Sequence, residues 1–296
     1  MRFIFKTDYE QDIRILKHSG YWWSYGALLA LLCLVPFVFG SYMQSQIVFV
    51  FIYAIVGIAL MILTGFTGQG SIGHAAFLAI GAYTAGAMQS KGVGFFDAGI
   101  LSVPVSIPIW KLGTINFTLP MPHLGYFIQA GLLTGLIGAL VGFPALRLHG
   151  IYLVIATISF GFIVEEILAR WESVTNGNEG MKIKALEFGG LALPRDGAGF
   201  YFLCLAALIV ILVAALNIMR SPTGRAFIAI RDSETASKSM GIDLAAYKVR
   251  AFAISATITG LAGVLYAHKL SFISPEIGNR SRRRRGAGPG RRTPAP

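Results

Sequence analysis

The chain has 296 residues and a mean hydropathy of +0.65, and only 13% of its residues are charged. Soluble domains carry about 25% charged residues, so the composition excludes an ordinary soluble protein. Seven arginines lie in the last twenty residues, and without them 18 basic residues face 14 acidic ones. The net charge of +11 is therefore concentrated at one end and gives no reason to expect nucleic-acid binding.

Several long stretches contain no Asp, Glu, Lys or Arg, and the longest runs from residue 18 to residue 90. A helix needs about 20 apolar residues to cross the hydrocarbon layer of a bilayer. We therefore predict an all-α, polytopic transmembrane helical bundle in contact with lipid, with residues 1–22 as a cytoplasmic segment and residues 23–276 as the membrane domain. The predicted spans, about seven in number, are 24–41, 47–64, 73–90, 125–146, 150–168, 199–219 and 251–268.

The distribution of basic residues predicts the orientation of the bundle. Lysines and arginines favour the cytoplasmic side, and they occur in residues 1–17, at Arg147 and throughout residues 220–250. Six crossings from a cytoplasmic N-terminus bring the chain back to the cytoplasm at Arg220, in agreement with this rule. The apolar stretch 95–110 contains Asp97, Pro104 and Pro108, and we expect an interfacial or re-entrant piece there.

Small residues recur four positions apart in several spans, as in Gly131–Gly135, Gly138–Gly142 and Ala256–Gly260. Such faces let helix backbones approach closely in lipid. We expect them to pack helices together and not to touch a substrate.

A glycine-rich segment, residues 65–74, separates the second and third predicted spans. Glycines weaken a helix, and unwound backbone inside a membrane is tolerated only beside protein or a water-filled cavity. Broken helices of this kind often line transport pathways, although an ordinary cytoplasmic loop fits equally well. For His74 a hydrogen-bonded structural role is favoured over a proton-carrying or ligand-binding one. The candidate pathway residues are Gly65, Gly68, Gln69, Ser71, Gly73 and His74.

Residues 220–250 predict two short helices outside the bilayer. Ser221 can cap the first with Pro222 at its first position, and Asp232 or Ser233 can cap the second, which Gly241 can end in a left-handed conformation. Such an amphipathic element either packs on the membrane surface or docks on a partner.

Two polar features lie near the outer end of the fifth predicted span. Glu165 and Glu166 are acids close to the membrane, where acids are costly and often functional; at the end of a span we expect them to reach water. Residues 175–180, Thr-Asn-Gly-Asn-Glu-Gly, predict a turn. No catalytic or metal-binding pattern is present, and Cys33 and Cys204 lie in apolar runs.

Four segments in order resemble the branched-chain amino acid ABC transporter permeases, over about residues 25–276. They are residues 64–77 with 81–85, residues 144–152, residues 175–180, and residues 221–248 with their Ser-Pro-Thr-Gly-Arg-Ala start. The family usually has Leu or a similar residue in place of Gly70, and its Glu-x-Ala-Ala core reads Glu-Thr-Ala-Ser at residues 234–237.

The resemblance implies an importer permease of the bacterial inner membrane for branched-chain amino acids or related small polar organic solutes. It implies alternating access and three kinds of partner: a second permease subunit, two cytoplasmic ATPase subunits, and a periplasmic or extracellular solute-binding protein. The chain itself would be no enzyme and bind no cofactor, because ATP is bound by the partner. In this family residues 220–250 are the coupling loop that docks on the ATPase, with Gly224, Arg225, Arg231, Glu234, Ala236 and Gly241 as matching residues. The alternative is an ATP-independent carrier or channel.

The end of the sequence departs from the resemblance. Residues 277–296 contain seven arginines, no lysine and almost no large apolar side chains, which predicts disorder. We expect family-like sequence to end near Glu276 and the remainder to be frameshifted, truncated or otherwise foreign; a native basic tail is the alternative.

Overall fold

The computed structural model describes residues 19–91, 104–109, 113–118, 121–145, 148, 150–188 and 191–274. The predictions for residues 1–18, for Arg147 and for the arginine-rich tail 277–296 fall outside these residues.

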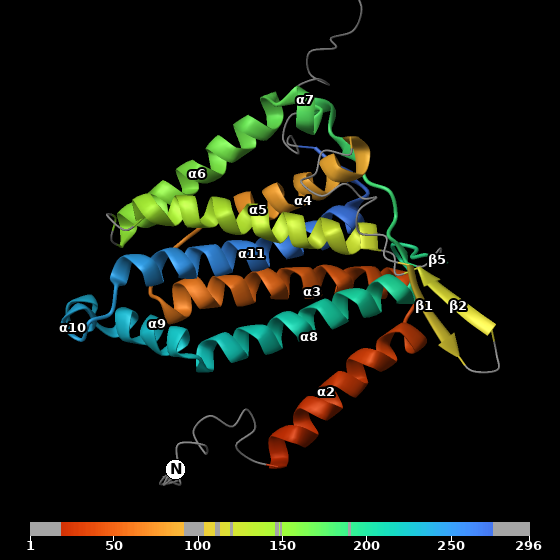
Figure 1. The fold of residues 1–296 in the computed structure, drawn as a ribbon, viewed down its shortest axis with the longest axis horizontal. Coiled ribbons are helices and arrows are strands. Elements are labelled where there is room, and N and C mark those ends of the chain that lie inside the picture. Colours follow the sequence, from red (N-terminus) through yellow and green to blue (C-terminus); the bar gives the residue numbers. More distant parts are fainter. Residues whose placement is uncertain are drawn as a thin grey trace, which may run out of the picture.

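The described chain is predominantly helical, which confirms the all-α prediction (Figure 1). Its helices are α2 (Ser19–Val38), α3 (Ser41–Leu60), the π-helix η1 (Met61–Phe66), α4 (His74–Lys91), α5 (Met121–Ala145), α6 (Ile151–Arg170), α7 (Glu172–Thr175), the 3-10 helix η2 (Gly177–Glu179), α8 (Ala198–Arg220), α9 (Pro222–Asp232), α10 (Glu234–Ser239) and α11 (Leu244–Leu270). The strands are β1 (Pro104–Ile109), β2 (Gly113–Thr118), β3 (Met181–Lys182), β4 (Glu187–Phe188), β5 (Leu191–Ala192) and β6 (Phe272–Ile273).

Each predicted span coincides with a helix, namely α2, α3 with η1, α4, α5, α6, α8 and α11. Five helical stretches in the described part of the chain are long and apolar enough to cross a membrane: Ser41–Phe66, Gly125–Pro144, Ile151–Arg170, Ala198–Arg220 and Leu244–Leu270. Neither α4 nor the apolar part of α2, Trp23–Val38, is among them. The protein is therefore a multi-pass helical membrane protein.

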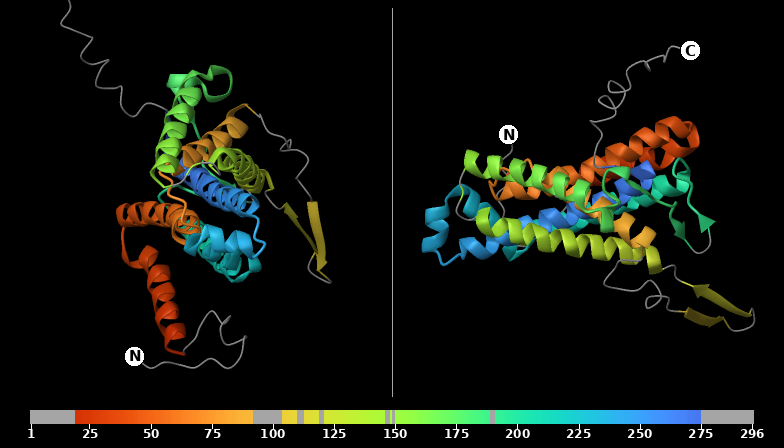
Figure 2. Two further views of the ribbon diagram at one scale, coloured as in Figure 1. Left: turned by 90° about the vertical axis from the view of Figure 1, so that its left-hand side faces the viewer. Right: turned by 90° about the horizontal axis from the view of Figure 1, so that it is seen from above.

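Helix α11 forms the centre of the bundle. It lies between α3 and α5 and also packs on α4, while α8 lies beside α3 and α6 leans away from the other helices (Figures 1 and 2). Phe252, Ala256 and Leu265 of α11 are fully buried. Helices α9 and α10 lie at the end of the bundle where α3 ends, and α7 lies at the opposite end (Figure 1). Under the positive-inside rule, the α9–α10 end is the expected cytoplasmic side.

Small residues allow the close approach of α4 and α5 to α11. A Cβ atom added to Gly260 would lie 2.0 Å from Oγ1 of Thr134 on α5, and one added to Gly81 would lie 2.2 Å from the carbonyl oxygen of Gly260. A Cβ atom on Gly138 would lie 2.3 Å from that of Ala256. The predicted packing role of these faces is therefore confirmed, since a side chain at these glycines would collide with the facing helix.

Within the stretch 95–110, for which the sequence predicts an interfacial or re-entrant piece, residues 104–109 form strand β1. This strand pairs antiparallel with β2, from Pro104 opposite Thr118 to Ile109 opposite Gly113. Val105, Ile107 and Ile109 alternate with other residues, and branched side chains with a period of two favour a strand. Residues 95–103 and 110 lie outside the described residues.

At the opposite end of the bundle, short strands and an ion pair attach the loops between the helices to the end of α11. Strand β3 pairs antiparallel with β6, which follows α11, and β4 pairs with β5. Lys269 near the end of α11 donates to Oδ1 of Asp196 at 2.7 Å and to the carbonyl of Arg195 at 3.0 Å. Residues 175–180 form the predicted turn, in which Asn176 and Gly177 have φ angles of 57° and 54°.

Candidate functional site

Residues 220–250, which the sequence resemblance predicts to be a coupling loop, contain the two short helices α9 and α10 that the sequence predicts, followed by the first turns of α11. Helix α9 has Ser221 as its N-cap residue and Pro222 in its first turn, and it buries Gly224, Phe227 and Ile230 against the bundle. The hydroxyl of Ser233 accepts a hydrogen bond from the amide of Ala236 at the start of α10. After α10 the chain turns at Gly241 with φ +83°, the left-handed conformation that the sequence predicts for this position.

The six residues assigned to coupling have different positions on this loop. Gly224 permits the tight turn from α8 into α9, since an added Cβ would lie 2.3 Å from the carbonyl oxygen of Met219. Among these six residues, Arg225, Arg231 and Ala236 have exposed side chains. Gly241 is exposed in the turn after α10, and Glu234 is half-buried. Arg225 donates to the carbonyl of Arg220 at 3.2 Å. The loop thus exposes two arginines.

The glycine-rich segment interrupts the helices as predicted. Helix α3 passes into the π-helix η1, residues 67–73 are not helical, and α4 begins at His74. The amide of Gln69 donates to the carbonyl of Leu63 at 3.1 Å, and Thr67 donates its hydroxyl to the same carbonyl. Gly68 has φ +69°, where glycine is favoured. The polypeptide therefore turns back along the end of η1 and enters the bundle again at α4.

The glycine-rich segment and α9 are in direct contact. Arg231 of α9 donates from Nη1 to the carbonyl oxygen of Gly65 at 3.1 Å. An added Cβ on Gly68 would lie 3.1 Å from Cγ of Arg231. Two sites that the sequence predicts separately, 166 positions apart, are thus joined in the structure.

Helices α9 and α10 also contact the central helix α11. Lys248 of α11 pairs with Glu234 of α10 at 2.7 Å, and the lysine side chain is only 7% exposed. Phe227 of α9 and Tyr247 of α11 meet edge to face with ring centroids 6.3 Å apart. The coupling loop is therefore attached to both the broken segment and the middle of the bundle.

The buried ring of His74 is held by two hydroxyl groups. Ser255 donates its hydroxyl to the carbonyl of Ala59 at 2.7 Å and lies 2.7 Å from Nε2 of His74. It can therefore only accept from His74, which assigns the proton to Nε2. Nδ1 then accepts from the hydroxyl of Ser71 at 3.3 Å. These contacts favour the structural role expected for His74, because the imidazole connects the segment with α3 and α11.

Gln69 is the polar residue of the segment that lacks such contacts. Its side chain is 5% exposed, and neither Oε1 nor Nε2 has a hydrogen-bond partner among the described residues. A buried amide without partners costs free energy. In this conformation the segment therefore contains a buried amide whose hydrogen-bonding groups are unpaired among the described residues.

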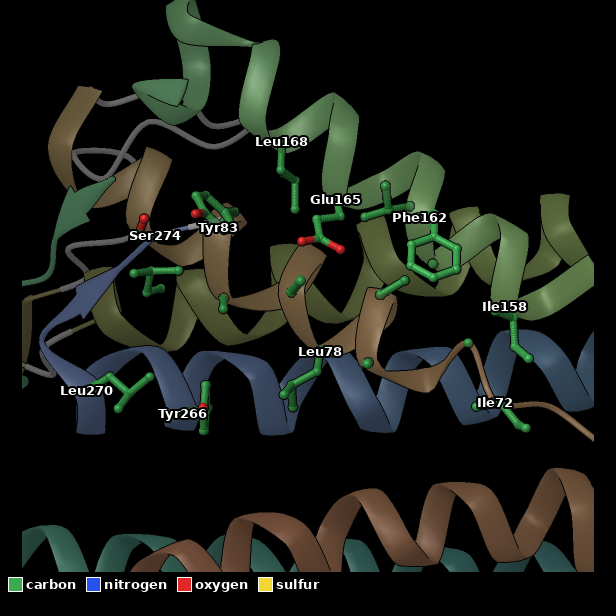
Figure 3. Close-up of a pocket in the computed structure, with 18 of the residues that line it drawn as sticks. Ile72, Leu78, Tyr83, Ile158, Phe162, Glu165, Leu168, Tyr266, Leu270 and Ser274 are labelled. Atoms are coloured by element: carbon green, nitrogen blue, oxygen red, sulfur yellow. The ribbon is translucent and has the colours of Figure 1, made fainter. Parts of the chain in front are cut away.

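A cavity of about 640 Å³ lies beside the segment, between α4, α6 and α11 (Figure 3). Ile72 and Gly73 line its cytoplasmic end, and the carboxylate of Glu165 points into it from α6 (Figure 3). The segment reaches α6 through the amide of Ile72, which donates to Oγ1 of Thr157 at 3.2 Å. An added Cβ on Gly73 would lie 2.5 Å from the carbonyl oxygen of Thr157.

The sequence did not single out Thr157, Ser255 or the cavity. Thr157 and Ser255 lie in charge-free stretches. Their polarity within an apolar run is the sequence feature that could have drawn attention to them. Glu165 and Glu166 both have exposed side chains, as expected. They differ in their surroundings: Glu166 pairs with Arg170, whereas Glu165 also lines the cavity. Among the described residues, no group of three or more His, Cys, Asp and Glu side chains could hold a metal ion.

The described helices form a multi-pass membrane bundle with a broken segment at one end, and comparison with known proteins specifies the family. Residues 42–281 match the family described as "Branched-chain amino acid transport system / permease component". The chain belongs to this family.

Individual relatives agree with this assignment. The chain is 32% identical to the high-affinity branched-chain amino acid transport system permease protein LivM of Escherichia coli K12, over 84% of this chain and 58% of the relative. It is 25% identical to a probable branched-chain amino acid transport permease protein LivM of Methanocaldococcus jannaschii, over 73% of this chain and 64% of the relative. The autoinducer 2 import system permease protein LsrC of Enterobacter sp. strain 638 is 26% identical over 52% of this chain and 45% of the relative.

The chain thus spans 58% of the length of the Escherichia coli relative. No solved structure matches it.

Proposed function

We propose that the chain is the transmembrane permease subunit of an ABC importer in a bacterial inner membrane. It moves branched-chain amino acids or related small polar organic solutes by alternating access. A separate subunit binds and hydrolyses ATP, so the chain has no ATPase site or cofactor of its own. Its partners are a second permease subunit, two cytoplasmic ATPase subunits and a periplasmic or extracellular solute-binding protein.

The observation that carries this proposal is the pair of contacts made by the coupling loop. An element at the cytoplasmic end bonds to the broken segment through Arg231 and Gly65, and to the central helix through Glu234 and Lys248. Movement of a docked ATPase would therefore reach both the segment and α11. A carrier or channel that works without ATP has no need of such an element.

The names of the relatives support the proposed substrate class. Two of the three relatives described above are named for branched-chain amino acid transport, and the third for import of autoinducer 2. Aliphatic amino acids are therefore the first substrates to test, with leucine as the representative.

The test is ATP-driven uptake by the assembled transporter. The chain is co-expressed with its neighbouring ATPase, second permease and binding protein, purified and reconstituted in proteoliposomes. Uptake of labelled leucine is expected only with ATP on the ATPase side. Uptake of equal rate without ATP would contradict the proposal and support an ATP-independent carrier or channel.

A variant of the coupling loop tests the docking role. Gly241→Val places a branched residue at φ +83°, which costs about 1–3 kcal/mol in the left-handed region. The ATPase is expected to co-purify less well and uptake to fall. Met240→Val is the matched control, since the neighbouring residue has φ −83° and is exposed. Full recovery of ATPase and uptake with Gly241→Val would contradict the assignment.

A further inference from the structure

The cavity between α4, α6 and α11 has walls that are apolar over most of their surface. Leu78, Phe162, Val164 and Leu168 contribute alkyl and aromatic groups to it. Its volume of about 640 Å³ lies within the range of roughly 300–1,000 Å³ that is usual for small-molecule sites. Such sites combine an apolar lining with a few polar groups that orient the ligand.

Glu165 is the acidic group of this cavity. It lies five residues before the end of α6, which is about 7 Å along the helix axis, so its carboxylate sits inside a stretch long enough to cross the membrane. Carboxylates at such positions are costly and as a rule functional. Glu166, its neighbour, pairs with Arg170, whereas Glu165 forms no ion pair with any residue that the structure describes.

Tyr83 supplies a second polar group from the facing helix α4. Its ring lines the cavity (Figure 3). Its hydroxyl is buried and finds no hydrogen-bond partner within the described part of the chain. A buried hydroxyl without a partner costs free energy, so the site gains from a ligand that supplies one.

We propose that this cavity binds the transported solute, and that Glu165 and Tyr83 select within it for an aliphatic solute with a primary ammonium group. The ammonium pairs with Glu165, the alkyl part packs on the apolar walls, and a polar group of the solute accepts from the Tyr83 hydroxyl. Charge complementarity favours this occupant over a lipid acyl chain, which has nothing to offer a carboxylate. The inference rests on the proposed function and assigns specificity to Glu165.

The position of the cavity connects binding with coupling. Ile72 and Gly73 line it, and they belong to the same segment whose Gly65 carbonyl accepts from Arg231. A movement of α9 that displaces this segment therefore changes the wall of the cavity, as release of a bound solute requires.

Thiol protection tests binding directly and without the binding protein. Cys33 and Cys204, the two native cysteines, are replaced, and Ala79→Cys places a thiol in the cavity wall. In the purified complex, leucine and 3-methylbutylamine are expected to slow labelling of this thiol, whereas 4-methylpentanoate, which lacks the ammonium group, is not. Equal protection by all three compounds, or by none, would overturn the proposal.

Substitution of the acid provides the second test. Glu165→Gln is expected to raise the KM for leucine uptake about tenfold, the effect of losing one hydrogen bond to a charged group, and to abolish protection of the thiol. Glu166→Gln is the matched control and is expected to change KM less than about twofold, since exposed ion pairs contribute little. An unchanged KM with Glu165→Gln would overturn the proposal while leaving ATP-driven transport intact.

Two further outcomes separate the alternatives. If Glu165→Gln prevents recovery of the second permease subunit, the carboxylate belongs to a subunit contact and the proposal is overturned. If the unmodified transporter shows no ATP-driven uptake but leucine still protects the thiol, the proposed function fails and the binding site stands.

Discussion

Buried polar residues near the broken segment fall into two groups. His74 has hydroxyl partners on both ring nitrogens, at 2.7 Å and 3.3 Å. Gln69, in the same segment, has none among the described residues. A hydrogen-bonded imidazole fixes the start of α4, while an unpaired amide destabilises the conformation that contains it. The segment is therefore held by hydrogen bonds at His74, its last residue. In its middle, the buried side-chain amide of Gln69 has no hydrogen-bond partner among the described residues.

We predict that Gln69→Leu stabilises this conformation by about 1–3 kcal/mol, because it removes the cost of a buried amide without partners. Uptake is expected to fall, since the transporter then leaves this conformation less readily. Thermal unfolding of the purified complex and leucine uptake measure the two effects.

Gln44→Leu is the matched control for this change. Gln44 is also buried, but its Nε2 donates to the carbonyls of Pro36 at 2.9 Å and Phe39 at 3.0 Å. Its replacement is therefore expected to destabilise the protein. If both variants lower the unfolding temperature equally, the interpretation of Gln69 is wrong.

Helix positions could be predicted from the sequence because charge-free stretches and helices coincide in this chain. The predicted span 199–219 corresponds to α8, Ala198–Arg220. Helix α11 begins earlier than predicted, at Leu244 and not at 251, because Asp243 caps it by accepting from the amides of Ala245 and Ala246. The predicted span began only after Lys248 and Arg250, because spans were identified as stretches without charged residues. The charged first turns of α11 were therefore assigned to the preceding loop.

The contacts between elements could not be predicted in the same way. The bond between Arg231 and Gly65 joins residues 166 positions apart, and no periodic pattern specifies which loop carbonyl an arginine reaches. The cavity results from the way α6 leans away from α4 and α11 (Figure 3). A single sequence predicts the helices but not the angles between them.

Helix packing provides a prediction at this scale. Gly260→Val would place a Cβ atom 2.0 Å from Oγ1 of Thr134, and overpacking of this kind costs about 1–3 kcal/mol. The unfolding temperature of the complex is expected to fall. Gly57→Val in α3 is the control, since an added Cβ there meets nothing within 4 Å. Equal effects of the two substitutions would contradict the close contact between α5 and α11.

The ion pair at the outer end of α11 predicts a dependence on pH. The hydrogen bond from Lys269 holds the pKa of Asp196 below its ordinary value. A depressed pKa means that the pair stabilises the fold above the unfolded-state pKa of aspartate, near 4, and that this contribution is lost as the pH falls through the lower folded-state value.

Unfolding temperatures measured from pH 7 down to pH 3 test this dependence. The unmodified protein is expected to lose stability toward the acid end more steeply than Asp196→Asn, which lacks the titrating group. Because Asp196 is largely exposed, the difference is expected to be small and to shrink in high salt. Identical pH profiles for the two proteins would contradict a folded-state role for the pair.

Over the whole molecule, the contacts form one path from the cytoplasmic end to the cavity. Helix α9 bonds to the segment at Gly65, and the segment reaches α6 at Thr157 and lines the cavity at Ile72 and Gly73. Helix α10 pairs with the central helix α11 through Glu234 and Lys248. If residues 220–250 dock on the ATPase as proposed, nucleotide-driven movement of this loop changes the surroundings of the glycine-rich segment.

State-dependent thiol labelling at Ser71→Cys tests this claim most directly. Ser71 is 6% exposed and Ile72 is 62% exposed, so Ile72→Cys serves as the control that reacts in every state. In the reconstituted transporter without native cysteines, a membrane-impermeant reagent is expected to label position 71 slowly in one nucleotide state and several-fold faster in another. Position 72 is expected to react rapidly in every state, because its side chain is already exposed. A labelling rate at position 71 that is the same with no nucleotide, with ATP and with trapped ADP would contradict the account.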